Sequence, residues 1–319
     1  DRDAGIIKID GETPSCECSI DPYNPLVISG KSEKMRHVFK MMGLVCTSRV
    51  NVLLQGDTGT GKELTARVIH SNCGFKDEPF IVFDCSAVVD TLLESELFGH
   101  EKGAFTGADQ TTRGKIEMAG NGTLFLDEIA QLPLNIQGKL LGFLQRREYT
   151  RVGGTKVLSS NCRIVAACNR DLSSMVAKKT FKEDLYYRLK VFTILLPPLK
   201  ERLSDVPLLV EHFLNKINLE LGTQVTKIQD GVMDRLVSHT WKGNVRELEN
   251  TIVQALVGCR GNVLLHEDVD KILTKSPSLP SQGLDSFSLA NMEKNHISKT
   301  LSQLHWNKSR AAKLLGISL

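Results

Sequence analysis

A glycine-rich loop is the feature of this sequence that most restricts its fold. Residues 56–62 read GDTGTGK and match the phosphate-loop pattern G-x-x-x-x-G-K. The loop follows the apolar run 50–54 and opens a helical stretch from Lys62 to about Ser71, which is the strand–loop–helix context that the motif requires. Its glycines let successive backbone N–H groups surround phosphate oxygens, and the helix N-terminus adds partial positive charge. A tight turn with a surface lysine is the alternative, but the matching flanks favour nucleotide binding.

The phosphate loop supplies the candidate nucleotide contacts. They are Gly56, Asp57, Thr58, Gly59, Thr60, Gly61, Lys62 and Glu63. Lys62 would reach the β- and γ-phosphates as a point charge. Glu63 departs from the pattern, because Ser or Thr usually follows the lysine and ligates Mg²⁺. A carboxylate can still approach Mg²⁺, directly or through water, so Glu63 is also a candidate metal residue.

Two adjacent carboxylates end another apolar run, which reads TLFLDE at residues 123–128. This is the Walker B arrangement. Asp127 would hold Mg²⁺ through its water shell, and Glu128 would orient and polarise the attacking water. The alternative is a helix N-cap whose acidic residues complement the dipole. Beside a complete phosphate loop we favour the catalytic interpretation, and the glutamate favours hydrolysis over a nucleotide-binding switch.

Two further polar residues lie near the ends of other predicted strands. Asn169 follows the run 163–167, where its side chain could bridge the water and the γ-phosphate, or simply cap a loop. Arg188 precedes the last apolar run and could be donated to the nucleotide of a neighbouring subunit as an arginine finger. Its alternative partner is Asp184, four residues earlier, in a surface ion pair. Both residues are candidate catalytic groups.

Periodicity divides the chain into an α/β part and a helical part. Apolar runs alternate with amphipathic stretches, which predicts a mostly parallel sheet covered by helices. The runs lie at 50–54, 80–83, 123–126, 163–167 and 191–196. Apolar residues at helical spacing then predict a small all-α domain, and a Ser-, Pro- and Gly-rich linker follows. The predicted parts are a flexible segment 1–24, the α/β domain 25–203, the helical domain 204–273, the linker 274–288 and a terminal helical module 289–319.

Composition excludes several other classes. The 319 residues are 41% hydrophobic and 24% charged, with a net charge of +3, as in ordinary globular proteins. No run of 18 apolar residues predicts a membrane span, and residues 1–10 do not resemble a secretory signal. Eight scattered cysteines favour reduced thiols over a disulfide framework, and Cys16 with Cys18 lacks the further ligands of a metal site. We therefore expect a cytoplasmic protein and, without an initiator Met, a fragment of a longer chain.

Several longer motifs occur in an order that resembles a known family. They are ESELFGHEKGAFTGA at 94–108, RVGG at 151–154, the segment 181–189, PPLKER at 197–202 and GNVREL at 243–248. Together they resemble the AAA+ domain of bacterial sigma-54-dependent transcription activators of the NtrC type, over residues 25–273 and into the terminal module. The resemblance implies a P-loop AAA+ sheet with a helical lid, ATP and Mg²⁺ as ligands, and a ring of six or seven subunits.

The hexapeptide GAFTGA is the most specific of these motifs. The resemblance implies that it tips a loop that contacts sigma-54 in the RNA polymerase holoenzyme. Gly103 and Gly107 permit a sharp turn, while Phe105 offers an apolar contact and Thr106 a hydroxyl. On the residues alone, the same segment could be a surface turn with an exposed aromatic. The implied contact residues are Gly103, Ala104, Phe105, Thr106, Gly107 and Ala108.

The resemblance also implies roles around the nucleotide. Asn169 matches the sensor I position, Arg246 the sensor II position in the lid, and Arg188 one of two trans-acting arginines. Ile28 lies where the family lines the adenine pocket.

Three positions depart from the family. Lys182 replaces the other trans-acting arginine and cannot form a planar bidentate fork. Asp84 replaces an asparagine that pairs with the catalytic glutamate, so Asp84 and Glu128 would repel or share a proton, and we expect an altered, pH-sensitive switch. Cys168 stands where Thr is frequent.

The terminal module 289–319 is basic and resembles the first part of a Fis-type helix-turn-helix, whose recognition helix would begin after Leu319. A solvated amphipathic helix is the alternative. Specific enhancer DNA binding would therefore need the complete module of the parent protein.

The leading interpretation is an ATP-hydrolysing activator that remodels the sigma-54 holoenzyme from closed to open promoter complex. One alternative is another AAA+ remodeller, which would have no reason to carry GAFTGA. The other is a nucleotide-gated DNA-binding regulator whose ATPase is idle, which Asp84 and Lys182 support.

Overall fold

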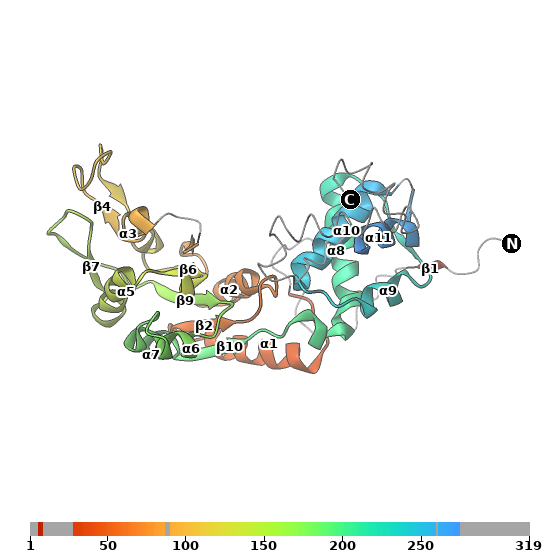
Figure 1. The fold of residues 1–319 in the computed structure, drawn as a ribbon, viewed down its shortest axis with the longest axis horizontal. Coiled ribbons are helices and arrows are strands. Elements are labelled where there is room, and N and C mark those ends of the chain that lie inside the picture. The colour runs from red at the N-terminus through yellow and green to blue at the C-terminus, as the bar shows by residue number, and fades with distance from the viewer. Residues whose placement is uncertain (1–5, 9–27, 87–89, 260, 275–319) are drawn as a thin grey trace, which may run out of the picture. The chain divides into compact units, whose positions relative to one another are not determined.

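The structure is a computed structural model that describes residues 6–8, 28–86, 90–259 and 261–274 (Figure 1). The chain separates into a unit of residues 1–272 and a second unit of residues 273–319. Cys16, Cys18, the terminal module and almost all of the predicted linker lie outside the described residues. In the described part, no helix has the length and apolar character needed to cross a membrane.

A five-stranded parallel sheet organises the first unit, which confirms the predicted α/β fold. Its strand order is β10-β2-β9-β6-β3. The strands are β10 (Phe192–Leu195), β2 (Val52–Gln55), β9 (Arg163–Cys168), β6 (Thr123–Asp127) and β3 (Phe80–Asp84). Each contains most of one predicted apolar run. Because the strands are parallel, their carboxyl ends meet at one edge, where Asp84 is in register with Asp127.

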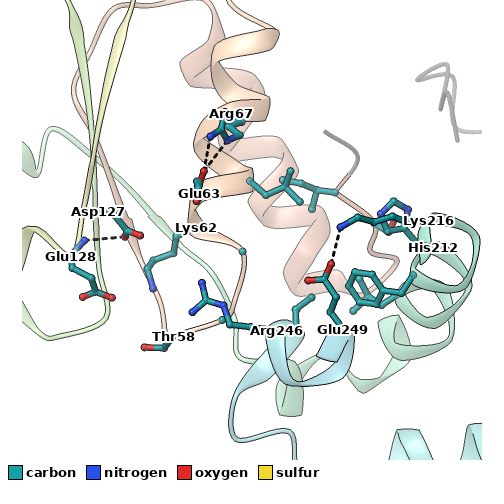
Figure 2. A pocket seen from close by; sticks show the side chains of 18 of the residues that line it. Thr58, Lys62, Glu63, Arg67, Asp127, Glu128, His212, Lys216, Arg246 and Glu249 are labelled. Carbon is teal, nitrogen blue, oxygen red and sulfur yellow. Dashed lines mark hydrogen bonds and ion pairs between the residues drawn. The ribbon is translucent and has the colours of Figure 1, made fainter. Parts of the chain in front are cut away.

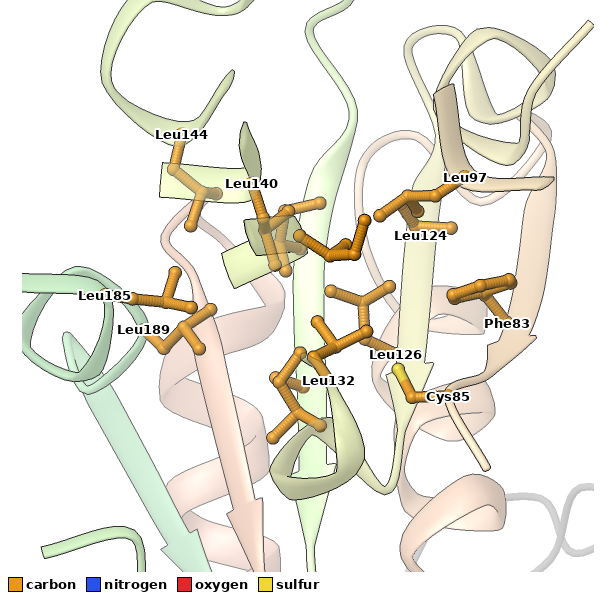
Figure 3. Packing of buried hydrophobic residues seen from close by; sticks show 14 of the residues in the cluster. Phe83, Cys85, Leu97, Leu124, Leu126, Leu132, Leu140, Leu144, Leu185 and Leu189 are labelled. Carbon is orange, nitrogen blue, oxygen red and sulfur yellow. The ribbon is translucent and has the colours of Figure 1, made fainter. Parts of the chain in front are cut away.

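Helices cover both faces of this sheet, so its strands are apolar on both sides. Adjacent residues therefore enter different cores: Leu53, Leu124 and Leu126 pack in one, and Leu54 and Phe125 in the other. Figure 3 shows part of the first core, in which Leu124 and Leu126 of β6 belong to one cluster with Leu97, Leu140 and Leu185. The helices of that face are α3 (Asp90–Phe98), α4 (Lys115–Ala119), α5 (Leu134–Arg146), α6 (Leu172–Ala177) and α7 (Glu183–Leu189). The opposite face carries α1 (Glu33–Cys46) and α2 (Lys62–Ser71).

Two short hairpins extend from the α/β domain. Strands β4 (Gly99–His100) and β5 (Thr112–Arg113) flank the loop that contains residues 103–108. Strands β7 (Glu148–Thr150) and β8 (Val157–Ser159) form the second hairpin. The two hairpins meet through a backbone bridge between His100 and Val152. A 3₁₀ turn, η1 (Ile129–Gln131), follows β6.

The helical part also confirms the sequence prediction. Two 3₁₀ turns, η2 (Leu199–Glu201) and η3 (Leu203–Asp205), connect the sheet to it. Its helices are α8 (Val206–Leu221), α9 (Val232–Ser238), α10 (Asn244–Gly258) and α11 (His266–Leu273). A small sheet that periodicity does not predict joins β11 (Lys227–Gln229) to β12 (Val263–Leu264) and to β1 (Ile6–Lys8). Thus three residues of the segment expected to be flexible form a strand antiparallel to β11, since backbone pairing needs no apolar pattern.

Candidate functional site

A cavity of about 760 Å³ lies at the carboxyl ends of the strands. Loop 56–62, the ends of β3 and β6, and helices α8 and α10 of the lid line it (Figure 2). The phosphate loop, the acidic pair and the lid arginine predicted from the sequence all contribute to this one cavity. Its position follows from the parallel sheet, because the loops that leave the carboxyl ends of parallel strands form a shared crevice.

The phosphate loop has the backbone form that the motif requires. Gly59 and Gly61 adopt φ angles of 80° and 101°, a left-handed region that side chains disfavour. Lys62 is only 7% exposed, and its Nζ donates to the carbonyls of Gly56 and Asp57 at 3.0 and 3.2 Å. The ammonium group is thus held over the loop, where it can meet a phosphate.

The acidic pair lies opposite this lysine, as Figure 2 shows. Asp127 ends β6, and its Oδ1 accepts a 2.9 Å hydrogen bond from the backbone N–H of Glu128. Glu128 adopts a left-handed φ of 48°, a strained conformation for a residue with a side chain. Its Oε2 is buried and, within the described chain, has no hydrogen-bond partner. Because Glu128 lines the cavity, its carboxylate group can accept a proton from a water molecule there.

The electrostatic surroundings hold these carboxylates less acidic than usual. Burial raises the pKa of Glu128, Lys62 opposes the shift, and the charges of Asp127 and Asp84 add to it. Burial likewise raises the pKa of Asp127, against a lowering by its hydrogen bond from Glu128 and by Lys62. A raised pKa makes a carboxylate a better proton acceptor for as long as it stays ionised.

Asp84, the predicted switch residue, lines the same cavity. Its Oδ1 accepts hydrogen bonds from the backbone N–H and the hydroxyl of Ser86, at 2.8 and 2.7 Å. Its influence on Glu128 is therefore that of a nearby charge. The neighbouring departure, Cys168, is buried, and burial raises the pKa of its thiol to about 11, so it is a neutral side chain at pH 7.

Glu63 also lines the cavity, on the first turn of α2. Its carboxylate forms an ion pair with Arg67, one turn along the helix, at 2.7 Å. Both side chains are about half exposed, so the pair is a weak one that a cation could break. Both hydrogen bonds from Arg67 go to Oε1 of Glu63, so its Oε2 can approach a metal ion while the pair is intact.

The remaining candidates divide between this cavity and the surface. Asn169 donates from Nδ2 to the Thr58 hydroxyl at 3.1 Å, so it lies beside the phosphate loop. Arg188 is exposed on α7 and donates to the carbonyl of Leu144 at 3.2 Å, rather than to Asp184. It is absent from the described lining of this cavity. Lys182 is exposed at the N-terminus of α7, with its side chain over Gly138 of α5.

The far end of the cavity is formed by the lid and by Ile28. Arg246 enters from the first turn of α10, as expected. Sequence reasoning missed the other lid residues here, which are Leu209, His212, Phe213, Lys216 and Glu249. Lys216 and Glu249 form an ion pair of 2.8 Å between α8 and α10. Nothing in the local sequence distinguishes these residues from other amphipathic helix positions.

Loop 103–108 is a compact, exposed turn. Gly103 N–H donates to the carbonyl of Ala108 at 2.8 Å and closes the loop. Gly103 and Gly107 have left-handed φ angles of 81° and 96°. Phe105 is 37% exposed, and its ring lies 5.0 Å from that of His100. Thr106 is exposed, but Ala108, at the end of the loop, is buried.

Arg151 joins the base of this loop to the neighbouring hairpin. It donates to Glu101 at 2.8 Å and to Glu117 at 2.9 Å, and the hydroxyl of Thr111 also bonds to Glu101. The two carboxylate partners of Arg151 come from two separate segments. Sequence reasoning recognised the RVGG motif but could not identify the partners of its arginine.

The chain matches three family models in succession. Residues 28–195 match the sigma-54 interaction domain, residues 200–283 the AAA+ ATPase lid domain, and residues 288–319 the bacterial regulatory protein, Fis family. The last match lies outside the described residues.

Known proteins similar to this chain extend the comparison. The transcriptional regulatory protein ZraR of Escherichia coli K12 is 40% identical over 311 residues, which cover 98% of this chain and 69% of ZraR. The regulatory protein AtoC of the same strain is 42% identical and covers 90% of this chain, which spans 64% of AtoC. The crystal structure of NtrX from Brucella abortus in complex with ADP has a TM-score of 0.74 and 30% identity, over 92% of this chain and 67% of NtrX. The phosphate loop, the acidic pair, the lid and loop 103–108 thus occur together in a chain that belongs to the sigma-54-dependent transcriptional activators and carries an AAA+ P-loop domain.

Proposed function

We propose that this protein hydrolyses ATP and uses the reaction to remodel the sigma-54 RNA polymerase holoenzyme from the closed to the open promoter complex. The supporting observation is that one short stretch of chain joins the loop 103–108 to the acidic pair of the cavity. Loop 103–108 leads through β5 and α4 directly into β6, which ends in Asp127 and Glu128. A change at the γ-phosphate therefore has a continuous, packed path to the loop.

The residues around the cavity fit ATP and Mg²⁺. The loop N–H groups and Lys62 suit a polyphosphate, and the Glu128 carboxylate, which lines the same cavity, suits the water that attacks the γ-phosphate. Mg²⁺, when bound, would neutralise charge on the phosphate oxygens, with Asp127 as its water-mediated ligand and Glu63 as a second ligand through the oxygen that Arg67 does not bind. Glu128 accepts the proton of the water, Asn169 orients it beside Thr58, and Arg246 contacts the phosphates from the lid.

Arg188 completes the site in an assembled ring. It is exposed and lies outside the described lining of its own cavity, so it is available to the nucleotide of an adjacent subunit in a hexamer or heptamer. The other proposed partners are sigma-54, bound by loop 103–108, and enhancer DNA, bound by the complete Fis-type module. Both partners place the action of the protein in the bacterial cytoplasm.

The substitution Phe105→Ala tests the sigma-54 contact. We expect sigma-54 affinity to fall by about thirtyfold, because an exposed aromatic anchor of an interface commonly carries this much binding energy. ATP turnover should stay near the wild-type rate, since Phe105 is remote from the cavity lining. Binding of purified sigma-54 is measured with a transition-state analogue of ATP present. Leu44→Ala, another exposed apolar residue, is the control. Equal sigma-54 binding by wild type and Phe105→Ala would contradict the proposal.

The substitution Asp84→Asn tests the charge effect on Glu128. Glu128 acts as a carboxylate, so turnover falls as the pH drops through its pKa, and its raised pKa moves that loss to higher pH. The asparagine side chain keeps an oxygen that accepts from Ser86 but removes one negative charge. The pKa of Glu128 then falls, and the acid limb of the kcat profile shifts to lower pH.

The profile is measured with saturating ATP and magnesium, and the exposed Asp77→Asn is the control. An acid limb that stays in place or moves to higher pH would show that Asp84 does not tune Glu128.

A further inference from the structure

The backbone carbonyls of the phosphate loop accept hydrogen bonds from other parts of the chain. Each carbonyl from Gly56 to Thr60 accepts a hydrogen bond from a donor outside this five-residue stretch. The bonds are Lys62 Nζ to Gly56 and Asp57, Asn244 Nδ2 to Thr58 at 2.9 Å, Val245 N–H to Gly59 at 2.9 Å, and Arg202 Nη2 to Thr60 at 3.0 Å. Three of these donors belong to the lid or to the connector that leads into it.

Because of the geometry of the peptide unit, these bonds to the carbonyls also orient the N–H groups of the loop. A trans peptide is planar, and its C=O and N–H point in opposite directions. A donor that fixes the carbonyl of Thr58 therefore fixes the N–H of Gly59 on the other side, and a donor on Thr60 does the same for Gly61. Gly59 and Gly61 both line the cavity. Asn244 and Arg202 thus orient groups that they do not touch.

Asn244 is suited to this task in several respects. It is only 2% exposed and adopts a left-handed φ of 56°, which asparagine tolerates better than most residues. Its Oδ1 accepts from the Leu199 N–H of the connector at 2.8 Å, while its Nδ2 donates to Thr58. An amide side chain provides this donor and this acceptor from one planar group.

The lid also rests directly on the loop backbone. A Cβ added to Gly59 would lie 2.2 Å from the carbonyl oxygen of Gly243, so no side chain fits between them. Helix α10 has no side-chain cap, and the carbonyl of Gly59 accepts from its early N–H groups, those of Val245 and Arg246. The phosphate loop therefore caps the lid helix.

We propose that Asn244 and Arg202 are positioning residues that set the peptide planes of the phosphate loop and couple phosphate occupancy to the lid. The inference rests on the proposed nucleotide binding and extends it. A phosphate on the N–H of Gly59 holds the peptide unit whose other end, the Thr58 carbonyl, accepts from Asn244 of α10. Because coupling is reciprocal, a displaced lid weakens phosphate binding by the same factor.

The test compares binding of ADP with binding of AMP, which lacks the β-phosphate, by the full 319-residue chain. Asn244→Asp keeps the acceptor for Leu199 but turns an oxygen towards the Thr58 carbonyl. We expect its Kd for ADP to rise about tenfold, while its Kd for AMP stays within about twofold of wild type. Arg202→Lys, which weakens the bond to Thr60 independently, should likewise raise the Kd for ADP more than the Kd for AMP.

Asn218→Asp is the matched control. Asn218 bridges the backbone within the lid in the same way, with Nδ2 on the Val225 carbonyl at 2.8 Å and Oδ1 on the Val225 N–H. The Asn218→Asp variant should lose about as much thermal stability as Asn244→Asp, without a change in the ratio of ADP to AMP affinity. Two results would overturn the inference: an equal loss of AMP and ADP binding in Asn244→Asp, or an equal change in the ratio of ADP to AMP affinity in Asn218→Asp. Either would show that the contacts of Asn244 serve only the packing of the lid.

Hydrogen exchange gives a second readout, independent of turnover. In the wild type, ADP should slow exchange of the Val245 and Arg246 amides, whose acceptor is Gly59. In Asn244→Asp at saturating ADP this protection should be lost. Retained protection would overturn the coupling while leaving nucleotide binding intact. A wild-type chain that binds no ADP would instead overturn the proposed function, and the inference with it.

Discussion

Glu128→Gln is expected to lower kcat for ATP by about 10²–10⁴-fold, the range that positioned general bases contribute. Glutamine has the same shape but cannot take the proton of the attacking water. The Glu128 carboxylate, whose Oε2 lacks a partner within the described chain, is the group that would receive it. Removing one negative charge from a cavity that also holds Asp84 and Asp127 should leave ATP affinity unchanged or stronger.

Phosphate release under saturating ATP measures the rate, and ADP binding verifies the folded site. Glu78→Gln, an exposed glutamate outside the described cavity lining, is the matched control and should retain wild-type turnover. Equal rates for wild type and Glu128→Gln would mean that this site does not catalyse hydrolysis. The interpretation as a nucleotide-gated regulator with an idle ATPase would then be preferred.

Arg188→Ala is expected to lower turnover by about 10³-fold, at the low end of what arginine fingers contribute. The guanidinium is exposed on α7, and its hydrogen bonds to the Leu144 carbonyl are long, at 3.2 and 3.4 Å. Its loss should therefore cost little stability. Lys182→Ala should have a smaller effect on turnover, because a lysine lacks the planar fork that binds a γ-phosphate with two hydrogen bonds.

Mixing two inactive variants tests whether Arg188 acts on a neighbouring subunit. Glu128→Gln subunits keep the arginine, and Arg188→Ala subunits keep the glutamate. Where an Arg188→Ala cavity meets a Glu128→Gln neighbour, the catalytic set is complete. Random assembly at equal amounts should therefore restore about a quarter of wild-type turnover. Turnover of the mixture no higher than that of the separate variants would show that Arg188 works within its own subunit.

Much of the fold was predictable because its signals are local. The run 123–126 and the alternation of apolar runs with amphipathic stretches indicate a parallel sheet with two covered faces, and β6 and β9 are buried along their length. The phosphate loop and the acidic pair could be placed in one site before any coordinates, because parallel strands bring their carboxyl ends to one edge. Strand β1 was not predictable, since its pairing with β11 spans more than 200 residues and depends on backbone bonds.

The candidate site likewise has some features that could be predicted from the sequence and others that could not. Glu63 is a plausible metal ligand from its position, but the structure pairs it with Arg67, and Arg151 gains its two carboxylate partners only through the fold. Sensor-type positions such as Arg246 could be found through their motif. The bond between Asn244 and Thr58, which are 186 residues apart, leaves no trace in local spacing.

Residue type and local periodicity determined which chemistry this chain can perform, because steric rules and side-chain functional groups act within a few residues. Tertiary structure alone decided which carboxylate has an oxygen without a partner in the described chain and is less acidic than usual, which arginine is exposed outside the cavity lining, and which donors hold the phosphate loop. Those properties depend on burial and on hydrogen bonds between distant segments, and such contacts exist only once the sheet and the lid have packed together.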